Sequence, residues 1–185
     1  MNRIVLTSLL ASVLVAGALA QTSEVGQRKD NQQERIARGV QSGQLTAGET
    51  SNLEKRESAI NQEVRTDRAL NGGKLTQAEK QTVNQQQNRM SNQINQDKHN
   101  AAQQHYGHNE VDARRENQQD RIANGISSGK LNAAQTSRLE KGQAAINQET
   151  RTDRSLNGGK LTQSEKQTIN KQQNQASKQI YKAKH

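Results

Sequence analysis

The chain repeats itself with a period of 86 residues. Residues 28–99 align without gaps on residues 114–185, and 47 of the 72 aligned positions are identical. Self-similarity at a fixed period is typical of a duplicated structural unit, so the period predicts two copies of one fold. Inside each copy a fainter period of 30 residues brings the pattern Gly-x-Leu-Thr-x-x-Glu at 43–49 onto 73–79. Each copy is therefore itself made of related segments.

This pattern combines a helix stop with a helix start. Glycine readily adopts the left-handed conformation that ends a helix, and Thr76 followed by Glu79 is the sequence of a capping box. The pattern recurs at 159–165 and, in a looser form, at 129–135. We expect each copy of it to be a helix–turn–helix junction.

Apolar residues between the junctions fall at helical spacing. Leu53, Ile60 and Val64 step by seven and by four, which places them on one face of a helix. The pattern predicts a short helix at about 28–38 and long helices at about 47–69 and 77–97, repeated near 114–124, 133–155 and 163–183. The predicted fold class is all-α, a tandem duplication of a short-long-long three-helix bundle or of a coiled-coil-like unit.

Few residues are available for a hydrophobic core. After residue 20, Leu, Ile and Val fill only 21 of 165 positions and Phe and Trp are absent, whereas Gln and Asn fill 44. This apolar share lies below the ~20% typical of folded chains, so the core is predicted to be thin and polar-rich. Two outcomes stay open: homo-oligomers, or partial disorder until a partner binds. Because the Gln and Asn residues alternate with charges at helical spacing, they favour helix surface over amyloid-like assembly.

The first residues are typical of an export signal. Arg3 precedes an apolar run from Ile4 to Val15, and residues 18–20 (Ala-Leu-Ala) offer a signal-peptidase site. Residues 1–20 are thus predicted to be a secretory signal peptide, and the lack of cysteine fits a bacterial periplasm or cell surface. The mature chain has no further apolar run that could cross a bilayer. Residues 21–27 are then a tail, 28–99 the first repeat, 100–113 a linker containing His and Gly, and 114–185 the second repeat.

Metal binding is the alternative function. The junction pattern resembles the second half of an EF-hand calcium loop, with Glu79 and Glu165 at the last ligand position. The first ligand position falls on Arg68 and Arg154, which repel a cation, so the resemblance covers only half of the loop. A transition-metal alternative rests on the histidines in and beside the linker: His99, His105 and His108.

No enzymatic activity and no cofactor are predicted. The chain has no nucleophile elbow, no His-Glu-x-x-His and no P-loop. With so few large apolar side chains it is also poorly equipped to enclose a pocket that excludes water. These features favour a binding or structural role over catalysis.

Charge gives the leading hypothesis. The formal net charge is +9, and the predicted last helix is rich in cations. We expect an anionic envelope polymer or lipid surface to bind through this helix, at Lys166, Lys171, Lys178 and Lys182. Specific nucleic-acid binding is not expected, because stacking aromatics are missing. The leading hypothesis is an exported, non-enzymatic helical repeat protein with an interaction or structural role in the periplasm or on the cell surface.

Overall fold

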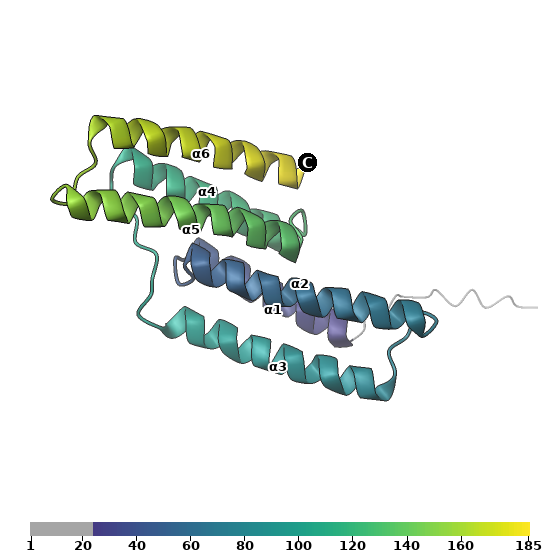
Figure 1. Ribbon diagram of the computed structural model, residues 1–185. Coiled ribbons are helices and arrows are strands. Elements are labelled where there is room, and N and C mark those ends of the chain that lie inside the picture. The colour runs from purple at the N-terminus through teal and green to yellow at the C-terminus, as the bar shows by residue number, and fades with distance from the viewer. Residues whose placement is uncertain (1–23) are drawn as a thin grey trace, which may run out of the picture.

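The computed structural model describes residues 24–185, and within this range it contains six α-helices and no strand (Figure 1). The all-α fold class is therefore confirmed. The helices are α1 (Glu24–Gln41), α2 (Ala47–Leu70), α3 (Gln77–His99), α4 (Glu110–Ser127), α5 (Ala133–Leu156) and α6 (Gln163–Lys184). None of the helices in this range is long and apolar enough to cross a membrane. The predicted signal peptide, residues 1–20, lies outside the described residues.

Two helices begin earlier than we predicted from the sequence. α1 starts at Glu24, within the segment expected to be a tail, and α4 starts at Glu110, within the expected linker. Each added turn carries a valine that packs inward: Val111 is buried, and Val25 is partly buried against the core. The backbone carbonyls of these valines also accept hydrogen bonds from buried glutamines. These contacts extend both helices, and the linker shortens to residues 100–109.

The junction between α2 and α3 joins a glycine turn to a helix cap. Gly72 and Gly73 have φ angles of +62° and +88°, which only glycine adopts without strain. The Glu79 amide donates to Thr76 Oγ1 at 3.3 Å, and the Thr76 amide donates to Glu79 Oε2 at 2.7 Å. The α5–α6 junction repeats these contacts between Thr162 and Glu165. Both junctions are thus held by hydrogen bonds between residues close in sequence.

We call α1–α3 the N-terminal half and α4–α6 the C-terminal half, and we call two residues equivalent when they are 86 positions apart. The halves pack together along α2 and α5 and along α1 and α4, while α3 and α6 lie on the outside (Figure 1). Ser51 Oγ donates to the backbone oxygen of its equivalent Ser137, and Ser137 Oγ donates back to Ser51, both at 2.9 Å. A reciprocal contact between equivalent residues marks an approximate twofold axis.

The halves share one main apolar core. Its largest cluster of buried side chains joins Ile36, Leu53 and Ile94 of the N-terminal half to Ile122 and Ile180 of the C-terminal half. Polar side chains are buried beside them, including the six carboxyl and amide groups of Glu54, Glu57, Gln87, Glu140, Gln143 and Gln173. The interior therefore combines a small apolar cluster with many buried polar groups.

Candidate anion-binding sites

A basic pocket of about 380 Å³ lies at the α2–α3 junction. The N-terminus of α1, the end of α2, the glycine turn and the first turns of α3 form its wall. The lining residues are Glu24, Val25, Arg68, Gly73, Lys74, Leu75, Lys80 and Asn84. We call it the first tip pocket, because the junction lies at one end of the molecule (Figure 1).

A second pocket, of about 340 Å³, lies at the α5–α6 junction, at the opposite end of the molecule (Figure 1). Every residue that lines the first tip pocket has its equivalent in this second tip pocket: Glu110, Val111, Arg154, Gly159, Lys160, Leu161, Lys166 and Asn170. Asn109 lines it as well. Two separate regions of the chain thus build the same site.

Each tip pocket places three cations against one carboxylate. In the first pocket these are Arg68, Lys74 and Lys80, opposite Glu24. The backbone dictates this convergence, because the glycine turn reverses the chain and brings the end of α2 next to the start of α3. A cluster of cations around a concave surface attracts anions and strengthens their hydrogen bonds.

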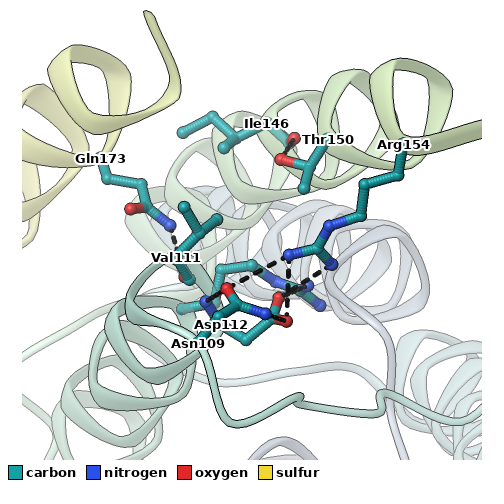
Figure 2. A network of polar contacts seen from close by, with 8 residues as sticks. Asn109, Val111, Asp112, Ile146, Thr150, Arg154 and Gln173 are labelled. Atoms are coloured by element: carbon teal, nitrogen blue, oxygen red, sulfur yellow. Dashed lines mark hydrogen bonds and ion pairs between the residues drawn. The ribbon is translucent and has the colours of Figure 1, made fainter. Parts of the chain in front are cut away.

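The arginine of the second pocket is held in place by a buried aspartate. Figure 2 shows Arg154 reaching from α5 to Asp112 and Asn109 at the start of α4; its Nη2 lies 3.1 Å from Asp112 Oδ2 and 3.2 Å from Asn109 Oδ1. Burial alone would raise the pKa of Asp112, but hydrogen bonds from Arg154 and Asn109 hold it below its usual value. Gly26 stands at the equivalent position in the N-terminal half. The surroundings of the two pockets therefore differ at this position.

An asparagine adds a neutral polar group to each wall. The Oδ1 atoms of Asn84 and Asn170 are shielded from solvent and have no hydrogen-bond partner within residues 24–185. Because solvent does not reach these oxygens, a ligand in either pocket meets chiefly the lysine ammonium groups. Lysines donate to carboxylate, sulfate or phosphate.

An exposed leucine lies beside each pocket. Leu70 is 78% exposed and its equivalent Leu156 is 77% exposed, each at the end of the helix that precedes the turn. An apolar side chain next to lysines favours contact with an anionic lipid surface. The tips thus carry features suited to either an anionic polymer or an anionic lipid.

The structure separates the four lysines that we predicted to bind an anionic surface. Lys166 lines the second tip pocket. Lys171, Lys178 and Lys182 are exposed farther along α6, where Lys182 and Arg138 line a shallower pocket of about 460 Å³. The lysines at 74, 80 and 160 were not among the predicted site residues. Their recurrence around both glycine turns was a signal in the sequence that could have identified them.

The two glutamates of the EF-hand-like pattern are engaged within the junctions. Glu79 accepts hydrogen bonds from the Thr76 amide at 2.7 Å and from Asn71 Nδ2 at 2.8 Å. These bonds, first of all the one from the Thr76 backbone, lower the pKa of Glu79. Glu165 makes the equivalent bonds. Both carboxylates therefore serve as helix caps.

The three histidines do not form a cluster of metal ligands. His99 ends α3, where its Nδ1 lies 2.7 Å from the Asn95 backbone oxygen, whereas His105 and His108 belong to the linker. Within residues 24–185, no group of three or more His, Cys, Asp or Glu side chains is placed to hold a metal ion. The arrangement gives no support to the metal hypothesis.

Three buried glutamates were missed by the sequence reasoning. Glu54, Glu57 and Glu140 are fully buried, and burial raises their pKa values to about 8, 7 and 8. The signal for Glu57 was its position four residues after Leu53 and three before Ile60, on the apolar face of the helix. Because no ligand reaches a fully buried group, these side chains affect stability and are not part of the tip pockets.

Comparison of the chain with protein-family models, with curated proteins and with solved structures found no match. The geometry and charge of the tip pockets are therefore the features that bear on function.

Proposed function

We propose that this protein is an exported, non-enzymatic interaction protein that binds anionic polymers or surfaces in the bacterial periplasm or on the cell surface. The two tip pockets are the principal sites, and the lysine face of α6 supplies an additional contact. The observation that carries the proposal is the duplication of one basic pocket, residue for residue, at the two ends of the molecule. The first 20 residues, with the features of an export signal, are the basis for the location.

The chemistry of the pockets favours a polymer with repeating anionic groups. Lys74 and Lys80 supply charge and hydrogen-bond donors for carboxylate, sulfate or phosphate. An acidic polysaccharide or a polyol phosphate carries such a group on every unit. Binding depends mainly on charge and is therefore expected to weaken steeply with salt.

We also infer that the chain is a tandem duplication of a three-helix unit with Gly-x-Leu-Thr-x-x-Glu junctions. The sequence identity between the copies and the reciprocal Ser51–Ser137 contact support this origin. Duplication gives one chain two similar sites, so a long polymer can occupy both. Occupation of two sites raises the overall affinity without any new kind of contact.

The proposal is tested by retention of the chain on an immobilised acidic polysaccharide, heparin, in a salt gradient. A pocket variant replaces Lys74, Lys80 and Lys160 by Gln, and a matched variant replaces Lys171, Lys178 and Lys182 by Gln. Both lose three positive charges. We expect the pocket variant to elute at clearly lower salt than the matched variant, because converging cations hold an anion better than scattered ones.

Two results would contradict the proposal. Equal elution of the two variants would mean that net charge alone governs retention. If the unmodified chain bound neither heparin nor vesicles with anionic headgroups, the proposal that it binds anions would be wrong. Circular dichroism of each variant checks that the exposed substitutions leave the helices intact.

A further inference from the structure

A groove of about 260 Å³ lies between the two halves, away from the tips. One wall comes from α1 and α2, with Lys29, Asp30, Gln33, Glu34 and Asn61. The other wall comes from the end of α4 and the turn after it, with Ile126, Ser127, Gly129, Leu131, Asn132 and Ala133. We call it the open groove. It is concave, mixed in polarity and formed only where the halves meet.

The approximate twofold axis places an equivalent of this groove on the other side of the molecule, and there the linker crosses it. The Gln104 amide donates to the Gly43 backbone oxygen at 2.8 Å. Tyr106 packs with its ring 5.3 Å from the guanidinium carbon of Arg115, a cation–π contact. We call this second site the filled groove, because residues 104–106 of the chain itself occupy it.

The two grooves are chemically alike. The open groove has a cation at Lys29 and the filled groove has one at the equivalent Arg115. The backbone oxygen is that of Gly129 in the open groove and that of Gly43 in the filled groove. Six further open-groove positions have equivalents of the same type in the filled groove: Glu116 for Asp30, Gln119 for Gln33, Asp120 for Glu34, Asn147 for Asn61, Val40 for Ile126 and Leu45 for Leu131. The partner of the cation differs, because Arg115 pairs with Asp112 at 2.9 Å and Lys29 pairs with Asp30 at 3.2 Å. Both grooves still offer a cation and a glycine backbone oxygen to a ligand.

Their occupancy differs. A Cβ atom added to Gly43 would lie 2.8 Å from the Gln104 backbone oxygen, whereas one added to Gly129 meets no atom of residues 24–185 within 4 Å. The chain has only one linker between its halves, and that linker covers one groove. The other groove has no cover from the described part of the chain.

We propose that the open groove binds an extended peptide segment of a partner protein through a tyrosine side chain, as residues 104–106 bind the filled groove. The partner's backbone amide donates to the Gly129 oxygen, and its tyrosine ring packs beneath the Lys29 ammonium. This site is independent of the anion-binding tip pockets. The protein's own linker is the template for the ligand.

The filled groove indicates why tyrosine suits the site. The Tyr106 hydroxyl oxygen is shielded from solvent, and this burial raises the pKa of Tyr106, although the positive charge of Arg115 opposes the rise. The ring thus enters as a neutral phenol that loses much of its contact with water. Tyrosine combines a large apolar surface with few rotatable bonds, so little conformational entropy is lost when it binds.

The test uses a fluorescein-labelled peptide with the linker sequence AAQQHYGHN, residues 101–109, and the chain from Gln21 to His185. Fluorescence polarisation measures binding. We expect saturable binding, and about tenfold or greater loss of affinity when the peptide's tyrosine is replaced by alanine. Because Lys29 lines only the open groove, K29A is expected to weaken binding severalfold. K29R copies Arg115 and is expected to preserve or strengthen binding.

Three outcomes would overturn the inference. They are an absence of saturable binding up to millimolar chain, equal binding of the alanine peptide, and equal binding by K29A and the unmodified chain. The last result would mean that the peptide displaces the linker from the filled groove. Because K29A leaves both tip pockets unchanged, its retention on heparin should stay near that of the unmodified chain, so this site and the tip pockets are tested separately.

Discussion

The three buried glutamates share a neighbourhood in which their charged form is disfavoured. Gln33 donates to Glu54 at 3.1 Å, and the equivalent Gln119 donates to Glu140 at 2.9 Å. The second oxygen of Glu54 and that of Glu140 have no hydrogen-bond partner within residues 24–185. Burial raises the pKa of Glu54 to about 8, and the negative charges of Glu57 and Glu140 add to the rise. Ionisation of these groups therefore opposes folding.

The fold is accordingly expected to be most stable at mildly acidic pH. The folded-state pKa values of Glu54, Glu57 and Glu140, about 8, 7 and 8, lie above the ordinary value of 4.5, so the folded chain holds these protons more tightly than the unfolded chain does. This stabilisation is complete below about pH 4.5 and is lost as the pH rises through 7 to 8. Thermal melts followed by circular dichroism from pH 5 to pH 9 should show a falling melting temperature.

The substitution Glu57→Gln is expected to reduce this loss. Its equivalent is already a glutamine, Gln143, whose Nε2 donates to Gln118 Oε1 at 3.1 Å. In the N-terminal half the corresponding acceptor, Gln32 Oε1, has no partner among the described residues. At pH 8.5 we therefore expect E57Q to add about 1–2 kcal/mol of stability, or about 3–6 °C in melting temperature. At pH 5, where Glu57 is protonated, the change should be small.

The exposed Glu116 provides the control for this substitution. E116Q should leave the slope of melting temperature against pH unchanged. If E57Q melts below the unmodified chain at pH 8.5, Glu57 is stabilising as a charged group and the explanation fails.

At the scale of the helix, two pairs of glycines have different roles. A Cβ atom on Gly39 of α1 would lie 2.7 Å from Leu45 Cδ1, and the equivalent contact between Gly125 and Leu131 measures 2.6 Å. The junction leucine thus packs directly on the helix that precedes it, at a place without a side chain. Gly48 and Gly142 have no neighbouring atom within 4 Å among residues 24–185. Only the first pair is required by packing.

Replacement by alanine should separate the two roles. Gly48→Ala copies the alanine found at its equivalent position 134 and is expected to stabilise the chain by about 0.5–1 kcal/mol, because alanine favours the helix. Gly39→Ala is expected to cost about 1–3 kcal/mol, because the buried Leu45 has to move. Urea unfolding measures both. Stabilisation by Gly39→Ala would show that the leucine repacks freely.

The positions of the helices were largely predictable because their signals are local. A threonine and a glutamate three residues apart, a pair of glycines and an apolar stripe each act over a few residues. The early starts of α1 and α4 were missed because they depend on distant partners: Gln87 donates to Val25 O at 2.9 Å, and Gln173 donates to Val111 O at 2.8 Å. Neither glutamine lies near its valine in sequence.

For the whole molecule, the position of the tip pockets at opposite ends has a functional consequence (Figure 1). One molecule can hold two polymer chains or two vesicles if each pocket binds an anion. We expect the chain to make anionic vesicles turbid at intermediate ratios of protein to lipid, and to leave neutral vesicles clear. The double variant K74Q/K80Q should bind vesicles through the second tip and cause little turbidity.

The matched control is K171Q/K178Q, which loses the same charge from the outer face of α6. It should still bridge vesicles. Equal turbidity with both variants would show that bridging does not depend on the tips, while leaving anion binding itself to be judged by the heparin experiment.

The candidate site was only partly predictable. Excess positive charge pointed to anions, and Lys166 was found because it lies in the cation-rich last helix. Lys74 and Lys160 lie in the junction turns, and nothing local indicates that an arginine from the preceding helix and a lysine from the next converge on them. Of the buried glutamates, Glu57 had a local signal in its position on the apolar face, whereas the contacts of Glu54 with Gln33 and of Glu140 with Gln119 join residues 21 positions apart.

The helical character of this chain, the places where its helices turn and the match of residues 28–99 with residues 114–185 are all readable in the sequence. These properties follow from caps, glycine turns and apolar spacing, whose energies are set within a few residues. The pairing of α2 with α5 around the Ser51–Ser137 contact is visible only in the folded molecule. The same holds for the tips at opposite ends and for the linker that covers one of the two grooves. These features depend on which helix faces meet, and those faces are far apart in the sequence. The chain has one linker between its halves, so that linker covers one groove and leaves the other open.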